Sequence, residues 1–369
     1  MKIAIDVSQV VHPGGVGVYT RNLVNNLLKI DKENEYLLFG ASLRKYQLLQ
    51  QPFLGEFTTK FYPLPPTIME FIFNQLRFPP IEFFTGKIDL FHSSDWIEPK
   101  ANCLKVTTVH DLAPIIYPEM HDIKIVEVFK RKLKLVKKES KTIIAVSSST
   151  KNDLVNKIGI SEEKIKVIYE AVDENFAKIK TDENILKRFN LKSFIISDAL
   201  KNERKNLRNL LNAFENLQDK NLQLVLPGES LWGEEKIKTI IEKSSLKDKI
   251  IMTGMLSLGE LKALYKNATV AVFPSFYEGF GLAILEAMSC GCPVITSNIS
   301  SLPEVAGDAA LLINPHDIVA ISQGIEKVIN DESFCDSLRK KGFVQVKKFS
   351  WERAAKETSE LYKEVGKQC

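Results

Sequence analysis

Several features that would identify other classes of protein are missing from this chain of 369 residues. Its five cysteines are odd in number, and Cys290 and Cys292 stand too close for a Cys-x-x-Cys pair. No Cys/His cluster has the spacing of a zinc site, so we expect free buried thiols. The apolar runs are short and interrupted, which argues against a membrane-spanning helix. The chain opens with KIAID, which we interpret as a buried strand and not as a secretion signal, so a cytoplasmic location is expected.

A strong excess of charge is also missing, because 50 Lys and Arg stand against 46 Asp and Glu and the net charge is +4. Lysines nevertheless gather in KRKLKLVKKESK, residues 130–141. This segment is either a solvated helix face or a basic surface that meets phosphates or membrane headgroups. Nucleic acid is not expected as a partner, because no aromatic platform or RNA-binding signature accompanies the charge. The aromatic, proline-rich residues 71–84 are either a core connection or a surface that touches acceptor or membrane.

Short β-branched runs that alternate with helical patterns are the main feature that is present. The composition, 44% hydrophobic and 26% charged, is typical of a soluble globular protein of two or three domains. Runs that are apolar throughout are typical of parallel sheets covered by helices on both faces. We therefore predict an α/β protein with two doubly wound, Rossmann-like domains. The predicted strands are residues 2–6, 36–39, 90–92, 106–109, 142–146, 166–169, 194–197, 222–226, 250–253, 270–273, 294–296 and 310–313.

The predicted domain boundary lies where apolar periodicity lapses, in residues 170–185. We expect a first domain of residues 1–172 and a second of residues 173–349. From Ser350 the chain has a serine N-cap followed by an amphipathic helix pattern. Two such domains would face each other across a central cleft, and ligands of open α/β sheets bind beyond the carboxyl ends of the strands. Functional residues are therefore expected directly after strands.

A glycine-rich turn follows the first predicted strand. Gly14, Gly15 and Gly17 precede a helix, where backbone N–H groups can approach an anion. As a dinucleotide fingerprint the turn is imperfect, because Thr20 stands where the third glycine belongs and no acid ends the second strand. The sequence is consistent with three interpretations of this turn: a tight turn alone, an anion site, or a nicotinamide-binding site. An NAD-dependent oxidoreductase or epimerase is accordingly an alternative function.

Basic side chains follow strands in both halves. His110 comes directly after residues 106–109, where it can hydrogen-bond a substrate or donate charge. His92, also at a strand end, is interpreted as structural. Arg204 and Lys205 follow the first strand of the second half, and we predict that they open its first helix. Because cations at a helix start oppose the helix dipole, a role in binding a diphosphate is favoured.

The stretch PSFYEGFGLAILEAMSCGCPVITS, residues 274–297, carries Glu278 and Glu286 around a glycine-rich helix start. If every residue from 278 were helical, the two carboxylates would be roughly 12 Å apart along the axis. Paired carboxylates of glycoside hydrolases are about 5 to 9.5 Å apart. The longer spacing suits a nucleoside diphosphate sugar, with hydroxyls at both ends and an anion between. No Asp-x-Asp pair occurs, so no metal or other cofactor is expected, and the two cations would neutralise the leaving group.

Together these motifs resemble one family over nearly the whole chain. They are PGGVGVYTRNL, VHDLAPIIYPE, AVSSSTKNDL, RKNLRNLLNAF, the 274–297 stretch, LPEVAGDAALLINPHD and FSWERAA. They are similar to the motifs of retaining glycosyltransferases of the GT-B fold, specifically glycosyltransferase family 4 (group 1). The resemblance implies transfer of a hexose from a nucleotide sugar to a hydroxyl of a glycan or lipid-linked acceptor. It also implies retention at the anomeric carbon by front-face attack, without a metal.

The resemblance implies roles for individual residues. It assigns the diphosphate to Arg204 and Lys205, the ribose to Glu286, and the donor sugar to Glu278 and His110. The remaining donor-binding residues would be Gly15, Gly17, Gly254, Met255, Gly279, Phe280, Gly281 and Leu282. A final helix, residues 350–369, would pack back onto the first domain.

HDLAPIIYPE and NQLRFPPIEFF look most like mannosyltransferase-type members that build cell-surface polysaccharide, which favours GDP-mannose over a UDP sugar. Peripheral contact with the inner membrane face would accompany such a role. One departure concerns the turn after residues 194–197. The family commonly has a glycine there, whereas this chain has Ser197, Asp198 and Ala199. A carboxylate at that place would repel a diphosphate unless it points away, so a non-catalytic nucleotide-sugar binder is a second alternative.

Overall fold

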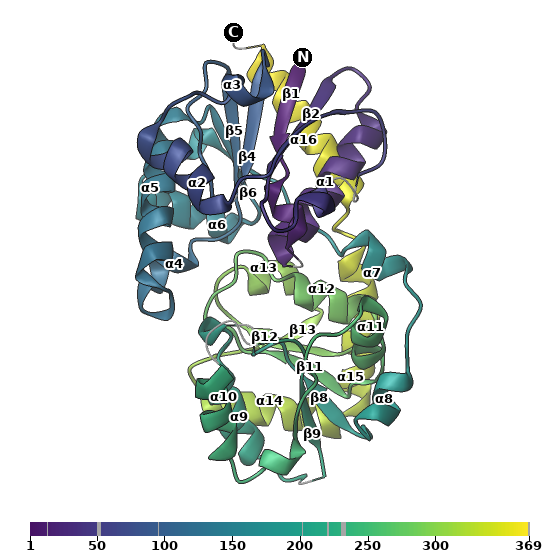
Figure 1. Cartoon of the computed structure of the whole chain (residues 1–369). Helices are drawn as coiled ribbons and strands as arrows, with labels where there is room; N and C mark the ends of the chain where they lie inside the picture. Colours follow the sequence, from purple (N-terminus) through teal and green to yellow (C-terminus); the bar gives the residue numbers. More distant parts are fainter. Residues whose placement is uncertain are drawn as a thin grey trace. The chain divides into compact units, whose positions relative to one another are not determined.

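The computed structural model describes residues 1–12, 14–49, 53–94, 96–200, 202–219, 221–229 and 234–367. Contacts divide the chain into two units (Figure 1). Unit 1 combines Met1–Glu170 with the segment from Ser350 onward, and unit 2 is Ala171–Phe349. Residues 368–369, at the end of the predicted final helix, lie outside the described residues.

Unit 1 is built on a seven-stranded parallel sheet, counted over the described residues. The strand order is β3-β2-β1-β4-β5-β6-β7, so the direction of winding reverses between β1 and β4. This arrangement is typical of doubly wound folds. The strands are β1 (Lys2–Asp6), β2 (Glu35–Ala41), β3 (Thr58–Tyr62), β4 (Leu90–Ser94), β5 (Leu104–Val109), β6 (Thr142–Ala145) and β7 (Ile165–Val167).

Unit 2 has a parallel sheet of six strands within the described part of the chain, in the order β10-β9-β8-β11-β12-β13. Here the winding reverses between β8 and β11. The strands are β8 (Phe194–Ile196), β9 (Gln223–Leu226), β10 (Ile250–Met252), β11 (Val270–Phe273), β12 (Val294–Ser297) and β13 (Ala310–Ile313).

Helices flank each sheet, as Figure 1 shows. In unit 1 they are α1 (Gly15–Ile30), α2 (Pro66–Glu70), α3 (Glu82–Thr85), α4 (Ala113–Ile116), α5 (Ile123–Glu139), α6 (Ser148–Asp153) and α16 (Trp351–Gly366). In unit 2 they are α7 (Glu174–Lys178), α8 (Asn184–Arg188), α9 (Leu207–Glu215), α10 (Glu234–Glu242), α11 (Leu258–Asn267), α12 (Leu282–Ser289), α13 (Leu302–Ala306), α14 (Ile318–Asn330) and α15 (Glu332–Val346). A search of the described helices found none both long and apolar enough to cross a bilayer.

The predicted α/β class with two doubly wound domains is confirmed by these two sheets. Each predicted strand overlaps an observed one. Strand β3 was not predicted, because its sequence TTKFY is polar over the first three positions and those positions are exposed. Among the described strands it pairs with β2 alone, at the edge of the sheet, where one side of the strand need not be apolar.

The final helix α16 lies along α1 in unit 1. Ser359 on α16 donates a hydrogen bond from Oγ to Asp31 Oδ2 at 2.6 Å. Farther along, Tyr362 Oη is 2.6 Å from Nδ1 of His92, whose Nε2 is 2.8 Å from Oγ1 of Thr108. His92 is 2% exposed and has both ring nitrogens in hydrogen bonds, in agreement with its interpretation as a structural residue. Polar contacts therefore fix α16 both to the end of α1 and to β4 of the first sheet.

Candidate active site

The predicted site residues of unit 2 gather beyond the carboxyl ends of β8 and β11, where the winding reverses. In open parallel sheets this is the place where ligands bind. Arg204 and Lys205 follow β8, and Glu278 follows β11. The Gly279-Phe280-Gly281 turn comes next and leads into α12.

Arg204 and Lys205 lie in a short 3-10 turn, η7 (Glu203–Lys205), and not in the first turn of a helix. Helix α9 begins only at Leu207, because Asn206 adopts a left-handed conformation with φ of 64°. The prediction that the two cations open this helix is therefore wrong. The Asn206 amide donates to the carbonyl oxygens of Pro274 and Pro315, at 2.9 and 2.8 Å, and so fixes the turn against the loop after β11.

Four charged side chains meet in this part of unit 2. Glu278 contacts Arg204 through Oε2, 2.7 Å from NH1, and Lys205 through Oε1, 2.9 Å from Nζ. Lys205 Nζ is also 2.5 Å from Oδ2 of Asp198. None of the four side chains is more than 12% exposed. The cluster holds two cations and two carboxylates, so its charges balance when all four are ionised.

The pairings keep Glu278 and Lys205 charged despite their burial. Burial alone would raise the pKa of Glu278, but Arg204 and Lys205 outweigh it and lower the pKa to about 2. Burial alone would lower the pKa of Lys205, but Asp198 and then Glu278 outweigh it, and the pKa is raised. Both side chains are consequently ionised at neutral pH.

Two serines that the sequence analysis did not single out hold the Glu278 loop. Ser300 Oγ donates to the Glu278 carbonyl oxygen at 2.6 Å and accepts from the Glu278 N–H at 3.1 Å. Ser301 Oγ lies 2.8 Å from the carbonyl oxygens of Glu278 and Phe280. Arg204 also donates to the carbonyl oxygen of Tyr277. The only sequence signal for these serines is their place in a polar turn directly after β12.

The glycine turn ends at Gly281, the residue before α12, with φ of 108°. A side chain there would be strained, and its Cβ would lie 3.0 Å from a methyl group of Leu302. Because residues 278–281 are not helical, the 12 Å spacing expected for a continuous helix does not apply. Leu282 and Glu286 lie on the first and second turns of α12, and both are partly buried.

Gly254 and Met255 follow β10, at the same edge of the second sheet. The Gly254 carbonyl oxygen accepts a hydrogen bond from the Gly228 N–H at 3.0 Å, which joins the turns after β9 and β10. Met255 is 60% exposed. An exposed apolar side chain beside a fixed backbone turn can pack against a planar ring without large rearrangement.

In unit 1 the glycine-rich turn after β1 packs closely against the preceding backbone. Gly15 begins α1, and Gly17 lies in its first turn. A Cβ at Gly17 would lie only 2.1 Å from the carbonyl oxygen of His12 and 2.8 Å from that of Gln9. Glycine is therefore required at position 17 so that α1 can press against this turn.

His110 follows β5 and is held by two side chains that the sequence analysis did not single out. Its Nε2 is 3.0 Å from Ser94 Oγ, and its Nδ1 is 3.2 Å from Glu170 Oε1. The ring also packs edge-on against Tyr19, with centroids 4.6 Å apart. A carboxylate only accepts hydrogen bonds, so His110 Nδ1 carries a proton and donates a hydrogen bond to Glu170. Ser94 ends β4 and Glu170 follows β7, so only the folded sheet brings them to His110.

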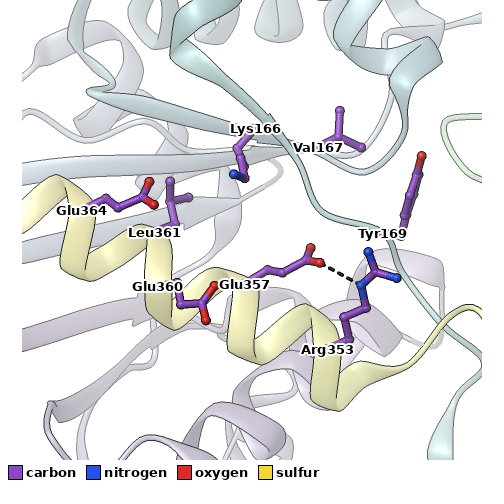
Figure 2. Close-up of a pocket in the computed structure, with 8 residues that line it drawn as sticks. All are labelled: Lys166, Val167, Tyr169, Arg353, Glu357, Glu360, Leu361 and Glu364. Atoms are coloured by element: carbon purple, nitrogen blue, oxygen red, sulfur yellow. Dashed lines mark hydrogen bonds and ion pairs between the residues drawn. The ribbon is translucent and has the colours of Figure 1, made fainter.

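A separate cavity of about 320 Å³ lies in unit 1 between α16 and the chain at and after β7 (Figure 2). The side chains that line it are Lys166, Val167, Tyr169, Arg353, Glu357, Glu360, Leu361 and Glu364. Three are glutamates, and one of the two cations, Arg353, is paired with Glu357 at 2.8 Å. This lining is unsuited to a diphosphate, and none of the predicted site residues belongs to it.

Comparison with known proteins identifies the family. Residues 13–176 match the description "Glycosyltransferase Family 4", and residues 178–345 match "Glycosyl transferases group 1". The chain is 32% identical over 281 residues to O-antigen chain mannosyltransferase B of Escherichia coli, and the match covers 74% of each protein. It is 33% identical over 290 residues to the serotype-specific mannosyltransferase WbdA of Escherichia coli, covering 74% of this chain but 35% of that protein. The chain thus spans about a third of the length of WbdA.

The fold agrees with this relationship. Sucrose-phosphate synthase from Thermosynechococcus elongatus superimposes with a TM-score of 0.77, at 20% identity over 100% of both chains. The chain therefore belongs to glycosyltransferase family 4 of the group 1 glycosyltransferases and has the GT-B fold. It is a hexosyltransferase. Neither alternative, an NAD-dependent oxidoreductase or epimerase and a non-catalytic nucleotide-sugar binder, agrees with this membership.

Proposed function

We propose that this enzyme transfers mannose from GDP-mannose to a hydroxyl group of a glycan or lipid-linked acceptor, in the synthesis of a polysaccharide. The names of the mannosyltransferase relatives support the choice of sugar. The observation that carries the proposal is the buried cluster of Arg204, Lys205 and Glu278 beyond the carboxyl ends of β8 and β11.

In the proposed reaction, Arg204 and Lys205 bind the donor diphosphate. Charge-assisted hydrogen bonds from these cations would stabilise the negative charge that develops on the leaving GDP. Glu278 holds both cations and approaches the donor sugar, and Glu286 binds the ribose hydroxyls. The N–H groups at the start of α12, at Phe280 and Gly281, would bind the distal phosphate, because a helix N-terminus attracts anions.

His110 contacts the donor sugar in this proposal. With its Nδ1 proton directed at Glu170, its Nε2 can form a hydrogen bond with a sugar hydroxyl in place of the one with Ser94. This would orient the sugar without transferring a proton to it.

The transfer would retain the configuration at the anomeric carbon. The bond from that carbon to the phosphate oxygen breaks, and the acceptor oxygen forms its bond on the same face. The acceptor proton passes to the departing phosphate oxygen, so no enzymic nucleophile is needed. The two cations would supply the charge neutralisation, and the proposed mechanism requires neither a metal ion nor another cofactor.

Incubation with GDP-mannose, UDP-glucose or UDP-galactose and a lipid-linked acceptor tests the donor. We expect mannose transfer from GDP-mannose, undiminished by EDTA, with retention visible in the anomeric NMR signal of the product. Lys205→Ala and Glu286→Ala should each reduce turnover by about 100-fold or more, in the range for loss of one transition-state contact. Lys192→Ala, which changes an exposed lysine of unit 2, is the matched control. Full turnover in both site variants, or transfer from UDP sugars alone, would contradict the proposal.

We also propose that unit 1 docks on an anionic membrane surface, where a lipid-linked acceptor would be found. Helix α2 and the following π-helical turn η3 (Phe71–Leu76) expose Ile68, Phe71 and Leu76, at 44%, 52% and 55%, and Phe78 beyond them is 68% exposed. Figure 1 shows α2 beside α5. Arg131 of α5 is paired with Glu70 of α2 at 2.6 Å.

Helix α5 supplies the charge for this surface. Its exposed charged side chains are Lys124, Glu127, Lys130, Lys134, Lys137 and Lys138. Basic residues near an anionic bilayer each contribute about 1 kcal/mol, and aromatic side chains insert at the headgroup level.

Co-sedimentation with vesicles tests the docking. We expect binding to vesicles of phosphatidylglycerol and phosphatidylcholine but not to phosphatidylcholine alone. Phe71→Ser combined with Phe78→Ser should weaken binding, whereas Phe343→Ser, at a half-exposed phenylalanine of unit 2, should not. Equal binding to both kinds of vesicle would contradict the proposal.

A further inference from the structure

Asp198 is a buried carboxylate next to the proposed diphosphate site. It lies two residues beyond the end of β8 and is 3% exposed. The sequence suggested that it would repel the donor unless it pointed away. Instead it is directed at Lys205, with Oδ2 2.5 Å from Nζ.

The contact restricts the position of the Lys205 ammonium group. An ammonium has three N–H donors, and Asp198 and Glu278 take two of them. A phosphate oxygen can take the third while both carboxylates stay in place. Two loops therefore hold the Lys205 ammonium group. Asp198 contacts it from the loop after β8, and Glu278 contacts it from the loop after β11.

Asp198 also changes the charge that a ligand encounters. With Asp198, the cluster has two positive and two negative groups and no net charge. Without it, Arg204, Lys205 and Glu278 together would have a net charge of +1. Charges in a poorly hydrated site interact strongly, so this difference affects every anion that binds there. It affects the nucleoside diphosphate product more than the donor, because the product has a free terminal phosphate in place of the bond to the sugar.

We propose that Asp198 is a positioning residue for transfer and that it sets the release of the product. It fixes Lys205 for contact with the diphosphate and cancels one positive charge, so that the nucleoside diphosphate leaves after the sugar has been transferred. This inference rests on the proposed function, because it requires that the cluster binds a diphosphate.

Asp198→Asn tests the inference, because it removes the charge and keeps the size of the side chain. Isothermal titration calorimetry with GDP and with GDP-mannose should show about tenfold tighter binding of GDP, and a smaller gain for GDP-mannose. In the transfer assay KM for the donor should fall together with kcat, and inhibition by added GDP should increase. A residue that served only to stabilise the fold would, on substitution, weaken binding and raise KM.

Asp173→Asn is the matched control, because it removes a carboxylate equally well buried in unit 2 but placed at the N-cap of α7. Its nucleotide affinities should equal those of the unchanged protein. Thermal unfolding checks that each variant is folded. Asp198→Ala, which removes the carboxylate altogether, serves as a second variant with the same expected direction.

Unchanged or weaker GDP binding by folded Asp198 variants overturns this inference alone, provided that the unchanged protein binds GDP. If the unchanged protein binds neither GDP nor UDP, nor their sugars, the proposed function fails and the inference fails with it.

Discussion

The Glu278 carboxylate contacts both Arg204 and Lys205, and the Glu278 backbone is held by Ser300. Removing one member of a buried group of charges is costly, because the partners stay buried without compensation. The same residue therefore contributes to the stability of unit 2 and, in the proposed function, arranges the two cations for the donor. Both roles depend on its being ionised.

We expect Glu278→Gln to reduce the free energy of unfolding by about 3 kcal/mol at pH 7. The carboxyl group has a pKa of about 2 in the folded protein and a reference value of 4.5. Its folded pKa is the lower one, so its stabilisation is fully present above pH 4.5 and is lost as the pH falls toward 2. Urea unfolding at pH 7, 5 and 3 should therefore show a difference between the two proteins that shrinks at pH 3.

Glu229→Gln, at an exposed glutamate of unit 2, is the control and should change the free energy of unfolding little at any of these pH values. A difference for Glu278→Gln that stays constant from pH 7 to pH 3 would contradict the assigned ionisation.

The start of helix α1 depends on one glycine. Ala at position 17 would place a methyl group within 2.1 Å of the His12 carbonyl oxygen, so the helix or the turn before it must move. Overpacking of this kind typically costs 1–3 kcal/mol, and we expect Gly17→Ala to lower the stability of unit 1 by about 2 kcal/mol or more.

Gly14→Ala supplies the comparison for this prediction. Gly14 is the N-cap of the same helix, its φ is −79°, and a Cβ there has nothing within 4 Å. Thermal unfolding should show a clearly lower midpoint for Gly17→Ala and a nearly unchanged one for Gly14→Ala. Equal midpoints would show that α1 does not need the close approach.

The sheets could be predicted from the sequence because most of their strands are apolar runs buried on both faces. The edge strand β3 lacks such a run, and its sequence TTKFY carries no clear signal. The start of α9 was also missed. The left-handed conformation of Asn206 is fixed by hydrogen bonds to Pro274 and Pro315, which are remote in sequence.

In the candidate site, too, the residues could be predicted from the sequence but their contacts could not. Spacing and motif likeness indicated Glu278, Arg204 and Lys205, but not that they contact one another, since 73 residues separate Arg204 from the Glu278 loop. The partner of Asp198 was equally invisible, because repulsion from a phosphate and attraction to Lys205 are both consistent with the sequence. The assigned roles of these residues in transfer stay predictions.

The two units differ in the number of chain segments that form them. Unit 2 is one continuous segment, Ala171–Phe349, whereas unit 1 needs the segment from Ser350 onward in addition to Met1–Glu170. Helix α16 buries Trp351, Leu361 and Tyr362 in unit 1. Removing it would expose this apolar surface and leave Asp31 and His92 without partners from α16.

We therefore expect a fragment of residues 171–349 to fold by itself and to bind GDP, and a fragment of residues 1–170 to lack a cooperative unfolding transition. Circular dichroism during heating measures the unfolding of both fragments. Adding a peptide of residues 350–367 to the second fragment should restore a transition, whereas the same peptide with Trp351→Ala and Tyr362→Ala should not. A cooperative transition of residues 1–170 alone would contradict the structural role of α16.

The return of α16 to unit 1 has a consequence for the order of events during translation. The ribosome makes the whole first sheet, then all of unit 2, and only afterwards the helix that covers α1. Until that moment the surface that receives Trp351 and Tyr362 is open, while the continuous segment of unit 2 is already complete. We therefore expect the half of the enzyme that is synthesised first to be the last to reach its native state, and to depend on chaperones during that interval.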